Sequence, residues 1–189
     1  MLTCAKLSAG AVLDSCKRAI AGINSDVILI NYEDIDRLSL TMNDNVVSTL
    51  ELKAGAKGYK FECRDGSPVG EYNLVRGTYL PGWEHVLNLV TLVKSQEIKD
   101  TIETLSFAKV VAIVDNKERG DADKIRYEIY GLESGLELIE SNNTTEYADE
   151  VVYNIKLSTG DAKENAMPRS AYKTDPTTTE TWINGLVTE

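Results

Sequence analysis

Residues 59–64 read YKFECR, a strict alternation of apolar and charged side chains. Because successive side chains of a β-strand point to opposite faces, this alternation predicts a half-buried strand. Val46, Leu50 and Leu52 share one phase over an earlier stretch, and the glycine-containing segment 54–58 lies between the two. We therefore expect a β-hairpin that joins a strand near 46–52 to the strand at 59–64.

Further along the chain the period changes from that of a strand to that of a helix. Residues 83–93 are apolar on both faces, as in a strand at the centre of a sheet or between two layers. Ser95 is a suitable N-cap, and Ile98, Ile102 and Leu105 follow at helical spacing. These residues predict one amphipathic helix at about 95–106.

The rest of the chain adds short strands and turns. Alternating or apolar stretches predict strands at 108–114, 125–130, 136–139 and 151–157, the first two joined by the polar loop 115–123. The predicted fold class is mainly β (α+β): a β-sandwich or barrel with one flanking α-helix.

Two segments do not fit the pattern of a compact domain. Residues 64–82 are rich in glycine and proline and predict a long projecting loop. The sequence divides into a β-rich assembly domain, 1–158, and an extended polar C-terminal arm, 159–189, with an apolar tip. The tip either docks on a neighbouring molecule or folds back on its own domain. The tip consists of Trp182, Ile183, Leu186 and Val187.

The amino-acid composition limits the kinds of molecule that the chain could bind. The chain has 189 residues, of which 42% are apolar, and a net charge of −10. That charge disfavours binding to DNA phosphates and to anionic lipid. Charged residues interrupt the only apolar stretch near the N-terminus, and no apolar run approaches the length of a membrane span. We expect a soluble protein made in a cytosol, and the three widely spaced cysteines do not suggest a disulfide framework.

The sequence contains few residues that could form a catalytic, metal or cofactor site. His85 is the only histidine, no Gly-x-Ser-x-Gly motif accompanies it, and its apolar strand indicates a structural role. No Cys or His pair has zinc spacing, and the loop 115–120 places Lys117 and Arg119 where calcium ligands would stand. We expect no catalytic residue, metal or cofactor. An acidic cluster near the start is read as a solvated strand-to-turn junction; it comprises Asp26, Glu33, Asp34 and Asp36.

The order of these features resembles that of tail tube proteins of tailed bacteriophages. The resemblance rests on paired strands within 108–130 preceded by the helix at 95–106, on the long loop 64–82, and on two phrases, Ile28–Ile35 and Tyr130–Leu136, similar to phage virion proteins. It implies a non-enzymatic subunit, assembled in the host cytoplasm, that forms stacked, usually hexameric rings in the virion tail. DNA would pass through the tube without specific binding, and other tail or connector proteins would be partners.

The resemblance also implies roles for individual residues. Contacts between copies would involve the long loop and the C-terminal tip, through Tyr72, Leu74, Val75, Tyr79, Trp182, Ile183, Leu186 and Val187. Carboxylates facing the lumen would come from Glu51, Glu62, Asp65 and Glu71. We expect deletion of 177–189, or shortening of 64–82, to leave a folded monomer and to weaken assembly.

The sequence leaves three alternative functions open. One is a head–tail connector or capsid-associated virion protein. Another is a monomeric β-sandwich module that binds carbohydrate or protein through Trp83, Tyr79 and Tyr72. The last is a small enzyme centred on His85 or on the pair Asp34 and Asp36.

Overall fold

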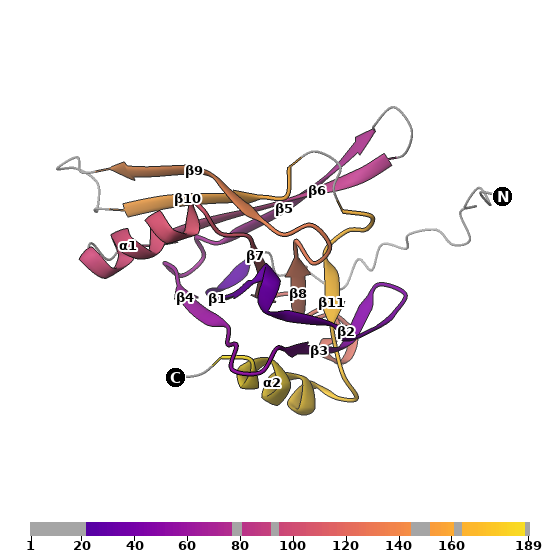
Figure 1. Ribbon diagram of the computed structural model, residues 1–189. Helices are drawn as coiled ribbons and strands as arrows, with labels where there is room; N and C mark the ends of the chain where they lie inside the picture. The colour runs from indigo at the N-terminus through magenta and orange to yellow at the C-terminus, as the bar shows by residue number, and fades with distance from the viewer. Residues whose placement is uncertain (1–21, 77–80, 92–94, 145–151, 161–163, 188–189) are drawn as a thin grey trace.

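A computed structural model describes residues 22–76, 81–91, 95–144, 152–160 and 164–187. The described chain forms two β-sheets and two α-helices (Figure 1). The predicted fold class is confirmed, because the architecture is mainly β with a flanking helix at the predicted place. The strands are β1 (Ile23–Asn31), β2 (Ile35–Asn43), β3 (Val46–Leu52), β4 (Tyr59–Glu62), β5 (Val69–Arg76), β6 (Pro81–Thr91), β7 (Val110–Asn116), β8 (Tyr127–Tyr130), β9 (Glu137–Thr144), β10 (Val152–Ser158) and β11 (Arg169–Ala171). The helices are α1 (Gln96–Leu105) and α2 (Pro176–Gly185), with short 3-10 turns at Tyr32–Asp34 and Asp121–Asp123.

The larger sheet has seven strands in the order β2-β3-β11-β8-β7-β1-β4, and the smaller has four in the order β5-β6-β10-β9. All registered strand pairs are antiparallel except β11 with β3. The four-stranded sheet lies across one side of the seven-stranded sheet, α1 lies beneath one end of it, and α2 lies on the opposite side of the molecule (Figure 1).

The centre of the seven-stranded sheet is buried on both faces. Along β7, Val110, Ala112 and Val114 pack toward the four-stranded sheet and α1, whereas Val111 and Ile113 belong to a second core beneath α2. This double burial explains why β7 is a continuous apolar run rather than an alternating one. Each face buries whole aliphatic side chains, each of which contributes roughly 1.5–3 kcal/mol to folding.

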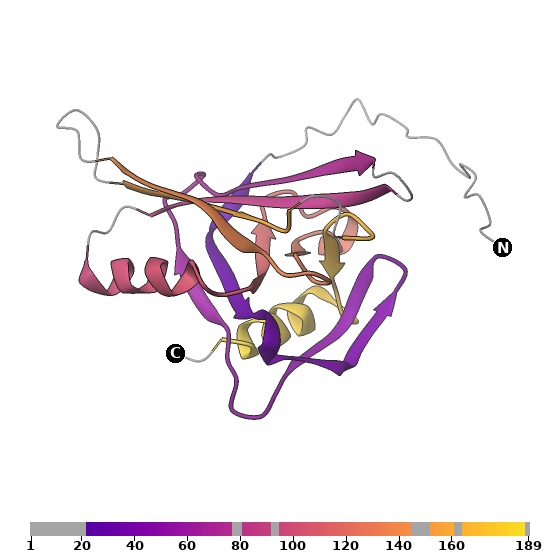
Figure 2. The same ribbon diagram turned by 45° about the horizontal axis from the view of Figure 1, so that its top comes forward.

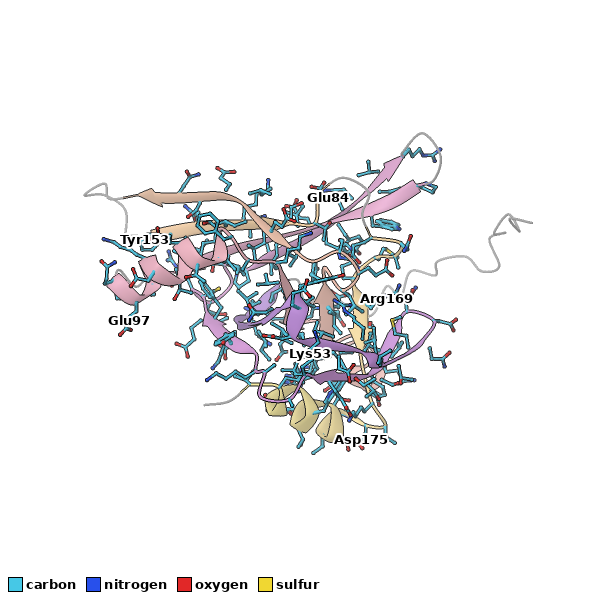
Figure 3. The ribbon with its side chains drawn as sticks, in the orientation of Figure 1. Lys53, Glu84, Glu97, Tyr153, Arg169 and Asp175 are labelled. Atoms are coloured by element: carbon cyan, nitrogen blue, oxygen red, sulfur yellow. The ribbon has the colours of Figure 1, made fainter. Side chains whose placement is uncertain are left out.

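Helix α1 begins where the sequence predicted. The Ser95 side chain accepts a hydrogen bond from the Ile98 N–H at 3.2 Å, which satisfies one of the free donors of the first turn. Ile102 and Leu105 are buried in the same core as Tyr153 of β10, and Figure 3 labels Tyr153 beside this helix. One apolar stripe therefore holds α1 against the inner face of the four-stranded sheet.

The predicted hairpin between 46–52 and 59–64 is wrong. Strand β3 pairs with β2 and β11, and β4 pairs with β1 at the far edge of the same sheet. The intervening residues cross the sheet instead, and the buried Gly58 donates to the Leu186 carbonyl at 2.7 Å. A Cβ at Gly58 would lie 3.1 Å from that carbonyl oxygen, so the crossing chain lies tightly against the C-terminal end of α2.

The prediction that residues 64–82 lack regular structure is also wrong. They contain β5, which pairs with β6 over Val69–Arg76 without a register shift. Gly70 interrupts the apolar face of this strand, and Val69 and Val75 place apolar side chains on its other face, which hides the alternation. The long loop is therefore largely one arm of a β-hairpin that reaches past the core at the end of the sheet away from α1 (Figures 1 and 2).

The C-terminal segment is not an extended arm over residues 164–187. Strand β11 lies inside the seven-stranded sheet between β3 and β8, and α2 covers the second core. Asp175 caps α2 by accepting from the Thr178 N–H at 2.9 Å, and Pro176 occupies the first turn. Of the two interpretations of this segment, folding back on its own domain is the one that the structure has.

Candidate assembly surfaces

The two sheets have four edge strands, and they differ in how well another chain could pair with them. The edges of the seven-stranded sheet are obstructed: β2 has two register shifts against β3, and β4 is only four residues long. On β4, Lys60 pairs with Asp26 at 2.8 Å and with Glu62 at 3.6 Å, which places charge on that edge. Bulges, short length and charge are the usual means by which proteins prevent pairing at an edge.

The edges of the four-stranded sheet are less obstructed, since neither strand is short and a single register shift interrupts their pairing. Strands β5 and β9 are each eight residues long, and each is paired on one side only within the described residues. Strand β5 pairs regularly with β6, and β9 has a single register shift against β10. These two edges, β5 and β9, are the sites at which a further strand could extend the sheet.

The β5–β6 hairpin exposes apolar side chains on its inner face. Tyr72 pairs directly with His85, and Leu74 pairs with Trp83, so these side chains share the face that is buried further along the sheet. Tyr72 is 45% exposed and Leu74 49% exposed, because the hairpin extends beyond the core at this point. The rings of Tyr72 and Trp83 meet edge to face with 6.0 Å between their centroids. We call the surface formed by Tyr72, Leu74 and Trp83 the hairpin patch.

The outer face of the same sheet carries charged and amide side chains as well as Val69, Val75, Val86 and Val90. The register places Glu71, Glu84 and Glu140 on this face together with Lys156. Asn142 and Asn154 stand directly opposite one another beside them and line a shallow hollow. Glu84, labelled in Figure 3, accepts a hydrogen bond from the Ser158 hydroxyl at 2.8 Å. The result is an acidic, amide-rich surface, which we call the outer face.

The predicted lumen carboxylates do not gather on one surface. Only Glu71 belongs to the outer face. Glu51 lies on β3, next to one edge of the seven-stranded sheet, and Glu62 lies on the opposite edge. Asp65 pairs with Lys117 at 3.2 Å. Glu84 and Glu140 lie on the outer face but are not among the predicted residues; Glu84 falls within the predicted strand 83–93, and Glu140 directly follows the predicted strand 136–139.

The predicted assembly contacts divide into two groups. Tyr72 and Leu74 are exposed on the hairpin, Val75 is half-buried on its other face, and Tyr79 lies outside the described residues. The members of the C-terminal group pack on their own domain, where Trp182 and Val187 remain partly exposed. Ile183 and Leu186 are buried, Trp182 donates to the Leu50 carbonyl, and Val187 pairs with Gly58.

His85 has the environment of a structural residue. It is 1% exposed, and both ring nitrogens bind backbone groups: Nδ1 accepts from the Gly131 N–H at 3.1 Å, and Nε2 lies 2.9 Å from the Ala166 carbonyl oxygen. Burial lowers the pKa of His85, although the negative charge of Glu164 acts in the opposite direction. A ring with both nitrogens engaged in this way has no free position for a substrate.

The other candidate reactive groups are engaged or suppressed as well. Asp34 accepts from the Asn31 amide at 2.8 Å, and Asp36 accepts from the Leu38 N–H at 3.0 Å, so each carboxylate stabilises a local turn. Burial raises the pKa of the Cys63 thiol to about 11, which keeps it protonated and unreactive near neutral pH. Within the described residues, no cluster of His, Cys, Asp and Glu could hold a metal ion.

The loop that superficially resembles a calcium site is a hairpin connection. It joins β7 to β8, and Arg126 at its end binds Asp115 through two hydrogen bonds of 3.0 and 3.1 Å. The same guanidinium group binds Glu180 of α2. The charged residues here tie the C-terminal helix to the sheet.

Comparison with protein-family models, curated proteins and solved structures finds no match for this chain. Neither helix of the described residues is long and apolar enough to cross a membrane. The case for a function therefore rests on the surfaces described above.

Proposed function

We propose that this chain is a non-enzymatic, self-assembling structural subunit of a virion, of the kind that forms a tail tube. The observation that carries the proposal is the four-stranded sheet with its two open edges, β5 and β9. A surface that is open at both ends of one sheet favours repetitive association of identical chains.

The directions of the strands support association from head to tail. The sheet contains four antiparallel strands, so its edge strands β5 and β9 run in opposite directions. A second copy rotated about an axis along the strands would bring its β5 antiparallel to β9 of the first. A contact of this kind is heterologous, and it closes into a ring when the rotation divides a full turn.

The two faces of the sheet suit the inside and the outside of such a ring. The core packs against the inner face, so the outer face would line the channel. Its surplus of Glu71, Glu84 and Glu140 over Lys156 would repel the phosphates of passing DNA. An acidic lining lets DNA slide without binding, which agrees with the net charge of −10.

The proposal is tested by placing charge on the open edge. Tyr72→Lys with Leu74→Lys puts two cations on the hairpin patch, and Ile139→Lys puts one cation on β9, where Ile139 is 55% exposed. We expect each variant to fold and to lose assembly. The matched control is Leu38→Lys, since Leu38 is 98% exposed but lies on the obstructed edge β2. Assembly by both edge variants at the wild-type level would overturn the proposal.

One other candidate has a specific observation in its favour. Tyr72 and the partly exposed Trp83 meet edge to face, and this aromatic surface would serve a monomeric β-sandwich module that binds a sugar. Such a module would remain a monomer, and a saccharide would shift its tryptophan fluorescence. A connector or capsid-associated role would use the same open edges, and it differs from a tube in that the rings do not stack.

A further inference from the structure

The root of the β5–β6 hairpin is closed by the C-terminal segment. Trp83 and Glu164 exchange two backbone hydrogen bonds, of 2.8 and 3.1 Å. Two residues further along β6, the His85 ring reaches the Ala166 carbonyl. The segment 164–166 therefore continues the line of β10 and holds β6 at the point where the hairpin leaves the core.

The partners of His85 define its protonation state. A carbonyl oxygen can only accept a hydrogen bond, so Nε2, at 2.9 Å from the Ala166 oxygen, carries the ring proton. The Gly131 N–H can only donate, so Nδ1, 3.1 Å away, must be unprotonated. The site accommodates the neutral imidazole alone, because a second ring proton would point at the N–H of Gly131.

The turn that carries Gly131 has little freedom to move away from such a proton. Gly131 has φ of +69°, and a Cβ there would lie 2.7 Å from the Leu136 side chain. The Gly135 N–H also donates to the Gly131 carbonyl at 2.9 Å. A protonated His85 would therefore lose one hydrogen bond and face a fixed donor.

The charged and titratable groups around the ring come from every element that packs on it. Glu164 is 2% exposed, and it accepts from the Ser134 N–H at 2.8 Å and from the Ser134 hydroxyl at 2.7 Å. Glu133 accepts from the Asn165 amide at 2.6 Å and from Arg169. Tyr130 meets the ring edge to face, with 5.7 Å between the two centroids, and Tyr72 pairs with His85 from β5. These carboxylates are occupied by donors of their own, so none of their hydrogen bonds is directed to His85.

We propose that His85 is an acid-sensitive clamp: a second ring proton, on Nδ1, pushes the imidazole away from the Gly131 N–H. Because Nε2 of the same ring holds the Ala166 carbonyl, this displacement releases segment 164–166 from β6 and loosens the hairpin that carries the open edge β5. The opening of the clamp follows from the geometry of the single chain. Its effect on assembly rests on the proposed function, in which β5 binds the next copy.

The direction of the pH dependence follows from linkage. Burial makes the pKa of His85 lower in the folded chain than its ordinary value of about 6.5. The unfolded or opened chain therefore binds more protons below pH ~6.5, and the free energy of opening falls as the pH decreases from there to the folded-state pKa. Two carboxylates, Glu133 after β8 and Glu128 within it, also have shifted pKa values. Burial acts to raise the pKa of Glu133, but hydrogen bonds from Asn165 and Arg169 outweigh it and lower that pKa. Glu133 therefore becomes protonated, and loses these bonds, only in stronger acid. Burial raises the pKa of Glu128, so this carboxylate makes the folded chain more stable as the pH falls, whereas His85 makes it less stable.

The test uses the full chain and its single histidine. Nuclear magnetic resonance follows the imidazole signal from pH 7.5 to 4.5, and amide exchange gives protection factors for Gly131 and Glu164 over the same range. We expect His85 to titrate below pH 6.5. The two protection factors should fall by roughly tenfold for each unit between that pKa and 6.5. An amide in β7, such as that of Ala112, should keep its protection and serves as the internal control.

Two results would overturn the clamp. A folded-state pKa of 6.5 or above would mean that the site tolerates the charge. Unchanged protection of Gly131 and Glu164 while His85 titrates would mean that the charge opens nothing. His85→Gln supplies the matched variant, since an uncharged side chain should abolish the step between pH 6.5 and 5. If that variant does not fold, the titration of His85 and the amide exchange of the wild-type chain still test the clamp.

A clamp that opens in a chain that never assembles would refute the proposed function alone. Assembly that persists unchanged while the protection of Gly131 and Glu164 falls would refute the effect of the clamp on edge β5.

Discussion

The indole N–H of Trp182 in α2 donates a hydrogen bond to the backbone carbonyl oxygen of Leu50 in β3, with 3.1 Å between the two atoms. This bond links residues that are far apart in the sequence, and it closes the second core beneath α2. On the other side of the helix, Arg126, directly before β8, binds Glu180. The C-terminal helix is therefore part of the folded domain.

Truncation of α2 should consequently destabilise the fold. Ile183 is 1% exposed, and Ile183→Ala removes buried aliphatic atoms and leaves a cavity, so we expect the free energy of unfolding to fall by about 3 kcal/mol. Urea unfolding measures this free energy, and Asn184→Ala, at an exposed position, is a control expected to change stability by less than about 0.5 kcal/mol.

Deletion of 177–189 should leave a largely unfolded chain, which revises the expectation that such a truncation keeps a folded monomer. A cooperative, wild-type-like transition in the deletion variant would show that α2 is dispensable.

A second prediction concerns the close approach of β5 to the core. A Cβ on Gly70 would lie 2.8 Å from Cζ of Tyr130, and nearer still to its hydroxyl oxygen; Tyr130 is 2% exposed and cannot swing into solvent. We expect Gly70→Ala to lower the free energy of unfolding by about 2 kcal/mol, as overpacking does. Tyr130→Phe removes the nearest atom and should recover part of that loss in a double-mutant cycle. Gly185→Ala, where nothing lies within 4 Å, should cost nothing. Equal stabilities of the Gly70 and Gly185 variants would contradict this packing.

A third prediction concerns the outer face. Glu71→Lys together with Glu140→Lys reverses the charge of that face, and we expect the variant to bind double-stranded DNA in a fluorescence anisotropy titration. Its affinity should fall steeply with added salt, because each phosphate contact releases a counterion. The wild-type chain should not bind. In an assembled particle the same variant should keep its tubes and slow the passage of DNA.

The control for this experiment has the same change in net charge at another place. Glu97→Lys with Glu103→Lys alters the exposed side of α1, away from the outer face. Equal DNA binding by both double variants would mean that net charge alone acts and that the outer face has no special role.

Local patterns were sufficient to predict most elements. The alternation of 59–64, the Ser95 cap with its apolar stripe and the paired strands of 108–130 all correspond to observed elements, since each depends on neighbours in the sequence. The Asp175-Pro176 pair was also a local signal for the start of α2, and it was overlooked because the surrounding threonines look like a linker.

Long-range pairing could not be predicted in the same way. Nothing in residues 46–64 distinguishes a hairpin from a crossing, because that choice depends on Ala171 of β11 pairing with Val47 of β3. The candidate surfaces depend on the same kind of information. Only the register between β5, β6 and β10 shows that Glu71 and Glu84 share a face while Glu51 does not.

The most direct test of the central claim, self-assembly, is light scattering of the purified wild-type chain after size exclusion over a range of concentrations, with negative-stain microscopy of the same fractions. We expect rings, or tubes of stacked rings, at pH 7.5, and their loss in Tyr72→Lys with Leu74→Lys. A chain that stays strictly monomeric at the highest concentration, with no rings in the micrographs, would contradict it.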